Sequence, residues 1–133
     1  MNVLLDTHFL IWALYDHKRL PEALIELLTD RNTCAEYSII SLWETEIKHI
    51  KHPDDFVFSA EELRKDAQAV GLHMLDLEPE HIMGLHMLKA PVNLKHNDPF
   101  DRMLIAQAKA ENIVLITHDS RLSAYGEECV AFI

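Results

Sequence analysis

Short apolar runs that alternate with segments of helical periodicity restrict the possible folds of this chain more than any other feature. Five such runs are predicted strands, at Asn2–Leu5, Thr33–Ser38, His73–Leu77, Ile113–Thr117 and Cys129–Ile133. Strands that alternate with helices favour an α/β sandwich built on a mostly parallel sheet. The 133 residues suit a single domain, which we expect to span positions 1–133.

The predicted helices are recognised by their starting residues and apolar stripes. Pro21 opens one, with Leu24, Ile25, Leu27 and Leu28 as its buried side chains. Ser41 starts another, which stops at Pro53 and buries Leu42, Trp43, Ile47 and Ile50. The remaining expected elements are a helix through Phe9–Leu14, a helix from Ser59 to Gly71, an amphipathic helix over Glu80–Leu88 (Ile82, Met83, Leu85, Leu88), a loop over Ala90–His96, a helix from Pro99 (Met103, Leu104, Ile105, Ala108) and a short turn or helix at Leu122.

Five acidic residues stand where predicted helices begin. Asp6 directly follows the first strand, and Asp119 follows the run Ile113–Thr117. If those strands are neighbours, both side chains converge outside the carboxyl ends of the sheet, where ligands of open parallel sheets bind. Asp98 and Asp101 open the Pro99 helix, and Glu44 falls in the first turn of the helix begun by Ser41.

Helix capping alone explains each acid taken singly. Asp6, Asp98 and Asp119 suit N-cap positions, Asp101 suits the third helical position, and Ser41-Leu-Trp-Glu44 fits a capping box. Capping, however, accepts Ser, Thr or Asn equally, whereas all five positions carry carboxylates. Crowded carboxylates raise one another's pKa and destabilise the fold unless a cation neutralises them.

A hard divalent cation is the simplest remedy for such crowding. Oxygen-only ligands select Mg²⁺ or Mn²⁺, which retain several water ligands. Two such ions roughly 3.5–4 Å apart can bridge a scissile phosphate and activate an attacking water. The expected reaction is therefore phosphodiester hydrolysis.

Four segments, in this order, resemble the motifs of PIN-domain nucleases. They are Leu4-Leu-Asp6-Thr7-His8, Ser41-Leu-Trp-Glu44, the run from His96 to Ala108 (HNDPFDRMLIAQA), and Thr117-His-Asp119. The resemblance spans nearly the whole chain and is closest to the VapC-like toxin branch. It implies a PIN-like (Rossmann-like) three-layer sandwich and a Mg²⁺- or Mn²⁺-dependent endoribonuclease that acts as the toxin of a type II toxin–antitoxin pair. It also implies a homodimer that is inhibited by a small antitoxin protein.

The resemblance assigns roles to individual residues. Asp6, Glu44, Asp101 and Asp119 match the four catalytic acids. Asp6, Asp101 and Asp119 would bind the metal directly or through water, and Glu44 would order water or bind a second ion. Asp98 matches an accessory acid, with capping as its alternative. Three neighbours would support the acids, namely the hydroxyls of Thr7 and Thr117 and the guanidinium of Arg102, which clamps a phosphate or balances the acidic pocket.

The end of the Ser41 helix is the most basic stretch of the chain. Lys48, His49, Lys51 and His52 form either an RNA-facing rim or a solvated helix face. The two tryptophans, Trp12 and Trp43, fall on apolar stripes and are expected to pack in the core.

The net charge of −10 excludes a broad basic surface for nucleic acid. Bound cations or a basic partner would have to supply the positive charge. Cys34 and Cys129 are expected to be buried thiols in a reducing, cytoplasmic setting, and no apolar run of about 18 residues predicts a membrane span. Nine histidines lack the ligand spacing of zinc sites, and the three isolated glycines form no phosphate loop.

Two other function classes remain as alternatives. The acids are caps in one of them, a non-catalytic module whose acidic surface docks a basic partner. The other is a metal-dependent phosphatase or phospho-receiver, which also gathers acids at a sheet edge. A receiver requires paired acids after the first strand and a late lysine, but Asp6 stands alone and no lysine follows Lys109.

Overall fold

A five-stranded sheet forms the centre of the molecule. The computed structural model describes residues 1–89 and 98–133. The strands are β1 (Asn2–Leu5), β2 (Cys34–Ser38), β3 (His73–Leu75), β4 (Val114–Thr117) and β5 (Val130–Phe132). They are all parallel, in the order β3-β2-β1-β4-β5. The predicted parallel sheet is confirmed, and the order of strands reverses direction between β1 and β4.

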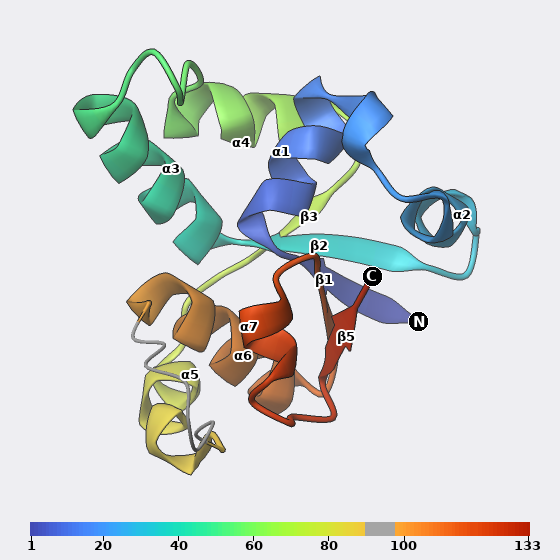
Figure 1. The fold of residues 1–133 in the computed structure, drawn as a ribbon, viewed down its shortest axis with the longest axis vertical. Coiled ribbons are helices and arrows are strands. Elements are labelled where there is room, and N and C mark those ends of the chain that lie inside the picture. The colour runs from blue at the N-terminus through green and yellow to red at the C-terminus, as the bar shows by residue number, and fades with distance from the viewer. Residues whose placement is uncertain (90–97) are drawn as a thin grey trace.

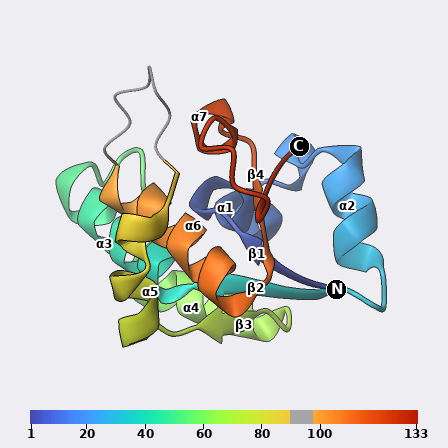
Figure 2. The same ribbon diagram turned by 90° about the horizontal axis from the view of Figure 1, so that it is seen from below.

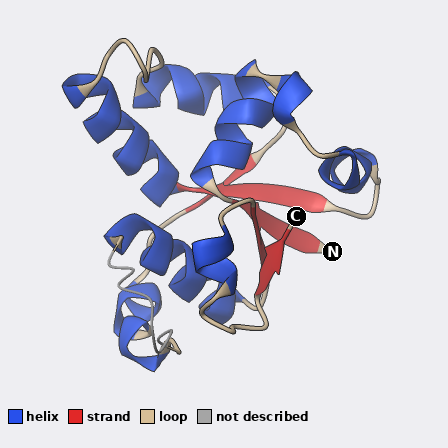
Figure 3. Ribbon diagram, viewed as in Figure 1, coloured by secondary structure: helices blue, strands red, loops and turns tan. Residues whose placement is uncertain are grey.

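Helices cover both faces of this sheet, which gives three layers (Figures 1 and 3). One side carries α1 (Thr7–Tyr15), the 3₁₀ helix η1 (His17–Arg19), α2 (Glu22–Thr29) and α4 (Ala60–Ala69). The other side carries α5 (Pro79–Met83), the 3₁₀ helix η2 (Leu85–Met87), α6 (Pro99–Glu111) and α7 (Ser120–Ser123). The view from below has α5 and α6 in front of the sheet (Figure 2). The remaining helix, α3 (Ile39–Lys51), continues from β2 past the end of the sheet and contacts both α1 and α6.

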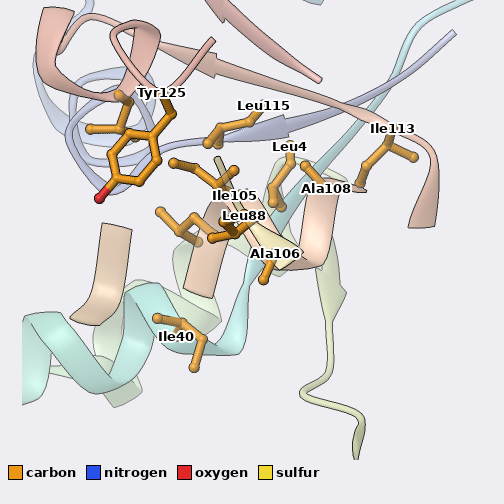
Figure 4. Packing of buried hydrophobic residues seen from close by; sticks show 11 residues of the cluster. Leu4, Ile40, Leu88, Ile105, Ala106, Ala108, Ile113, Leu115 and Tyr125 are labelled. Atoms are coloured by element: carbon orange, nitrogen blue, oxygen red, sulfur yellow. The ribbon is translucent and has the colours of Figure 1, made fainter. Parts of the chain in front are cut away.

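The two apolar cores follow from the alternation of side chains along β1. Leu4 points into the cluster beneath α6, together with Ile105 and Leu115 (Figure 4). Val3 and Leu5 point to the opposite cluster. All three β1 side chains are fully buried, because a central parallel strand is covered on both faces.

The start of α3 differs from the prediction. The helix begins at Ile39, and Ser38 is its N-cap, since the Ser38 hydroxyl accepts the N–H of Ile40 at 3.0 Å. The predicted capping box from Ser41 is therefore wrong, and Glu44 lies beyond the first turn. The buried side chains of α3 are Ile40, Ser41, Glu44 and Thr45, whereas Trp43 and Ile50 are 58% and 73% exposed.

Two other apolar stripes are wrong only in part, because Leu24 of α2 and Leu88 after η2 are buried as predicted. Ile25 of α2 is exposed. On α5, Ile82 and Met83 are exposed, and His81 is fully buried instead. The His81 ring packs inward because both of its nitrogens have polar partners. Nδ1 accepts the Glu78 N–H at 3.0 Å, and Nε2 lies 2.7 Å from a Glu111 carboxylate oxygen.

Two further boundaries differ from the prediction: β3 ends at Leu75 rather than Leu77, and the helix expected over Glu80–Leu88 is divided at Gly84 into α5 and η2. Other features agree with the sequence. Ser59 caps α4, and Gly71 follows that helix with a φ of +84°, a conformation that favours glycine. The predicted inner face of α6, Leu104, Ile105 and Ala108, is fully buried. The predicted loop Ala90–His96 lies outside the described residues. None of the described helices has the length and apolar character needed to cross a membrane.

Candidate active site

Asp6 lies at the reversal point of the sheet, between β1 and α1. Its Oδ1 accepts the N–H of Phe9 at 2.8 Å, which caps α1. Its Oδ2 accepts the Thr117 hydroxyl at 2.6 Å and the His118 N–H at 3.4 Å, both from the end of β4. Burial raises the pKa of Asp6, and these hydrogen bonds only partly oppose the rise. Thr117 thus contacts an acid, as predicted.

Glu44 reaches the same region from α3. Its Oε1 accepts the Thr7 hydroxyl at 2.8 Å, and its Oε2 accepts the Lys48 ammonium at 2.6 Å. The Thr7 hydroxyl also lies 2.9 Å from that of Ser41, so α1 and α3 are joined beside the acid. Glu44 is only 4% exposed, because α1 covers this face of α3. The predicted support from Thr7 is directed at Glu44.

Asp98 and Asp101 reach the site from the start of α6. Asp98 is the N-cap, and its Oδ1 accepts the N–H groups of Phe100 and Asp101 at 2.9 and 3.2 Å. The pKa of Asp101 rises from 3.8 to about 7. Burial is the largest cause, followed by the negative charges of Asp98, Glu44, Asp119 and Asp6. The negative charges of all four other predicted acids therefore act on Asp101, although these acids come from different parts of the chain.

Asp119 follows β4 and caps α7. Its Oδ1 accepts the Arg121 N–H at 2.9 Å, and its Oδ2 accepts Nη2 of the same arginine at 2.8 Å. The carboxylate in turn raises the pKa of Arg121. Arg121 was not predicted; its only signal was a cation two positions after the last acid. Arg102, which was predicted to act here, lies instead with its Nη1 3.5 Å from the Tyr125 hydroxyl.

At this edge of the sheet, acids that cap helices also converge on one centre. Asp6, Asp98 and Asp119 are all N-caps, as one interpretation of the sequence proposed. Each cap bond fixes a carboxylate at a helix start, and each of these helices starts near Asp101. The acids can therefore be caps and still face a common centre.

A pocket of about 230 Å³ opens beside these acids. It is lined by Asp6, His8, Trp12, His118 and Asp119. The Trp12 and His118 rings meet edge to face with centroids 5.8 Å apart. Trp12 is half-buried: it packs against the core cluster on this side of the sheet, as predicted, and also lines the pocket.

The donor set fits a hard divalent cation. The five acids offer carboxylate oxygens, and burial together with the neighbouring negative charges raises the pKa of Asp101 to about 7, a cost that a cation would partly relieve. In the described ranges 1–89 and 98–133, no three His, Cys, Asp or Glu side chains stand together as a finished ligand set. Mg²⁺ does not require one, because it keeps several waters and takes only one or two protein carboxylates.

The basic end of α3 is divided between two environments. Lys48 is paired with Glu44, and His49 contacts the Phe56 carbonyl through Nδ1 at 2.6 Å. Lys51 and His52 are exposed. Only the latter two remain open to solvent as a rim, while Lys48 belongs to the acidic site.

Solved structures with a similar fold include two VapBC complexes. One is VapBC2 from Rickettsia felis bound to a promoter DNA fragment, with a TM-score of 0.68, 19% identity and coverage of 100% of this chain and 98% of that chain. The other is VapBC-1 from nontypeable Haemophilus influenzae, with a TM-score of 0.68, 18% identity and coverage of 99% and 98%. A toxin–antitoxin complex from Klebsiella pneumoniae has a TM-score of 0.62 at 20% identity, covering 97% and 95%. At such identities the likeness concerns the fold.

No curated protein sequence matches the chain significantly. The sequence model of one family, the PIN domain, matches residues 3–128. That range contains all five junction acids and every strand up to β4. Sequence motifs, parallel sheet and family model agree, and the chain belongs to the PIN domain family.

Proposed function

We propose that this chain is a Mg²⁺- or Mn²⁺-dependent endoribonuclease and the toxin of a type II toxin–antitoxin pair. One observation carries the proposal. The pKa of Asp101 is raised to about 7 by burial and by four further acids at the starts or inner faces of neighbouring helices. Strongly perturbed acids in a cleft are a mark of functional sites.

Asp6, Asp101 and Asp119 would hold the cation directly or through water, Glu44 would order water or hold a second ion, and Asp98 would be accessory. When bound, the cation supplies positive charge for the phosphate and lowers the pKa of an attacking water. The chain itself fixes the acids in place. Thr117 holds Asp6, while Thr7 and Lys48 hold the two oxygens of Glu44.

Charge favours a substrate whose binding depends on the site's cations. With a net charge of −10, the chain would repel a polyanion over most of its surface. Lys51 and His52 are the exposed members of the predicted RNA-facing rim. RNA as the substrate is taken from the resemblance to VapC-like nucleases, and the cytoplasm as the location is inferred from the free thiols of Cys34 and Cys129.

Two protein partners complete the proposal. The similar complexes are named as VapBC or toxin–antitoxin assemblies, which supports a small antitoxin as a partner. The net charge of −10 suits a partner that presents basic side chains. A second copy of the chain would cover the apolar groove between α3, α5 and α6, whose volume is about 600 Å³. Trp43, Ile82 and Phe100 are among its lining residues.

RNA cleavage by purified protein tests the enzymatic proposal. We expect wild type to cut single-stranded RNA with Mg²⁺ and to stop when a chelator is added. Asp6→Asn and Asp101→Asn should each lower the rate by at least about a hundredfold, because each removes a charge at the reacting centre. Glu26→Gln, which removes an exposed acid of α2, should cleave like wild type.

Retained cleavage in both active-site variants, or in the presence of chelator, would refute the mechanism. If none of the proteins cuts RNA but a basic partner binds to all of them, the interaction-module alternative replaces the enzyme.

A further inference from the structure

A second pocket adjoins the carboxylate pocket and shares a wall with it. It has a volume of about 180 Å³ and lies between α1, α3 and the segment that leads into α4. Figure 1 shows the helices α1, α3 and α4 packed together at one end of the molecule. His8 and Trp12 line both pockets. A ligand that spans this shared wall can therefore contact Asp6 or Asp119 with one part and the second pocket with another.

Aromatic rings dominate the second pocket. His8 and Trp12 of α1 line it together with Phe56 and Phe58 of the segment between α3 and α4. The Phe58 ring is itself stacked on Tyr15, with centroids 3.6 Å apart. An aromatic lining suits a flat, unsaturated ring, because base–aromatic stacking tolerates every base. A cavity of about 150 Å³ accommodates a benzene ring. The pocket is thus of the size for one planar ring system.

Thr45 supplies an unusual polar group in this apolar wall. Thr45 is 2% exposed. Among the described residues, its hydroxyl oxygen is the one buried side-chain nitrogen or oxygen atom that has no hydrogen-bond partner. A buried hydroxyl without a partner costs free energy, which a ligand that offers a partner would recover. Threonine in a helix has two accessible χ1 rotamers, so the hydroxyl can turn toward the pocket.

Positive charge also gathers around the pocket's rings. The Arg19 guanidinium lies 5.6 Å from the Trp12 ring centroid, and the Lys48 ammonium lies 5.2 Å from that of Phe56. Arg19 pairs with Asp16 and Lys48 with Glu44, while Asp55 adds one carboxylate to the lining. Cations stacked on rings beside an acid-lined site are suited to a nucleotide, whose base is flat and whose phosphate is anionic.

We propose that this pocket binds the nucleobase next to the cleaved phosphate, with Thr45 donating or accepting a hydrogen bond at the base edge. The inference rests on the proposed function, because the shared wall places the pocket beside the carboxylates that would act on the phosphate. A base in this pocket would set the position of the scissile bond over Asp6 and Asp119. The pocket would then contribute to which RNA sequence is cut.

Nucleosides test the pocket apart from catalysis, since they lack a phosphate. Metal-free, ¹⁵N-labelled protein is titrated with adenosine, guanosine, cytidine and uridine, and the indole N–H resonances are followed. We expect at least one nucleoside to shift the Trp12 resonance, while that of Trp43, which lines a different groove, stays in place. Thr45→Val should weaken this binding about three- to tenfold, the effect of one lost hydrogen bond.

Thr29→Val, at an exposed position of α2, is the matched control and should bind like wild type. The proposal is overturned if no nucleoside shifts Trp12, if Thr45→Val binds as tightly as wild type, or if indole alone binds, which would mark a site for a partner's side chain. Nucleoside binding without RNA cleavage would leave the pocket standing and refute only the nuclease. Thr45→Val removes an unpartnered hydroxyl, so we expect no loss of folding stability that would obscure the result.

Discussion

Asp101 bears most of the cost of gathering five carboxylates at one edge. It is partly buried at the third position of α6, where the helix dipole favours a negative charge. Burial and four neighbouring acids nevertheless raise its pKa to about 7. With a pKa of about 7 and no bound cation, about half of the Asp101 side chains are protonated at pH 7, and ionising the rest lowers the stability of the fold.

The pH dependence of stability follows from the sign of that shift. The folded pKa of Asp101 exceeds the value of 3.8 for a free carboxyl, so the folded state binds the proton more tightly. Its contribution to stability is complete below pH 4 and is lost as the pH rises through about 7. We therefore expect Asp101→Asn to stabilise metal-free protein at pH 8 by about 2 kcal/mol. A rise in pKa from 3.8 to about 7 corresponds to about 4 kcal/mol at 1.36 kcal/mol per pKa unit, and we halve this value because the side chain is partly exposed.

Thermal unfolding in chelator at pH 4 to 8 measures this difference, which should shrink toward the acidic end. Asp54→Asn, at an exposed position outside the site, is the matched control and should follow wild type. An Asp101→Asn variant that is less stable than wild type at pH 8 would show that the carboxylates do not repel one another.

Asp6, Asp98, Asp101 and Asp119 were predictable from the sequence, because each stands at the start of a helix. Glu44 was singled out from a wrong helix start, since it lies beyond the first turn of α3. Arg121 and Thr45 were not predicted. The ion pair of Arg121 with Asp119 depends on the short turn of α7, and the isolation of the Thr45 hydroxyl depends on which face of α3 is buried. The spacing of two residues between Asp119 and Arg121 was a weak local signal of that pair, whereas nothing in the local spacing indicates the isolated Thr45 hydroxyl.

The helix α3 shows how a small error in a boundary changes the interpretation of an element. Ser38 ends β2 and caps α3 without an intervening loop, and its hydroxyl also contacts the buried Gln107 of α6. Ser41, the predicted start, faces Thr7 instead. Periodicity located the helix, but the true buried face includes polar Glu44 and Thr45, which an apolar stripe cannot reveal.

Trp43 and Ile50 are exposed on α3 and are therefore available to the proposed second copy of the chain. Trp43 meets Phe100 edge to face, with centroids 5.1 Å apart, at the apolar groove. We expect wild type to sediment at twice the chain mass of 15.4 kDa and Trp43→Glu to sediment as a monomer, because a charge placed in an apolar contact is costly.

Ile25→Glu is the matched control, since Ile25 is an exposed apolar residue of α2 outside the groove. It should remain dimeric in sedimentation velocity. A monomeric wild type, or a Trp43→Glu variant that still dimerises, would remove this groove from the proposed interface.

At the scale of the whole molecule, strand order creates the site. The order reverses between β1 and β4, so Asp6 and Asp119 emerge at adjacent carboxyl ends, and α3 and α6 bring Glu44 and Asp101 to the same edge. Alternation of strands and helices predicted the parallel sheet. It did not specify which strands are neighbours, which depends on long-range packing of the two cores.

The acidic site lies in a molecule that is itself acidic, with a net charge of −10. The proposed function therefore depends on bound cations more than on the few exposed bases of α3. If a cation binds at this edge, it must displace the proton that Asp101 retains near neutral pH. Metal binding and proton release should thus be coupled at one residue.

Calorimetric titration of metal-free protein with Mg²⁺ at pH 7, in two buffers of different ionisation enthalpy, measures both metal binding and the accompanying proton release. We expect saturable binding with proton release in wild type and in Asp54→Asn. In Asp101→Asn, we expect at least about tenfold weaker binding without that proton release. Equal Mg²⁺ affinity in wild type and Asp101→Asn, or no binding in either, would contradict a metal site built on these carboxylates.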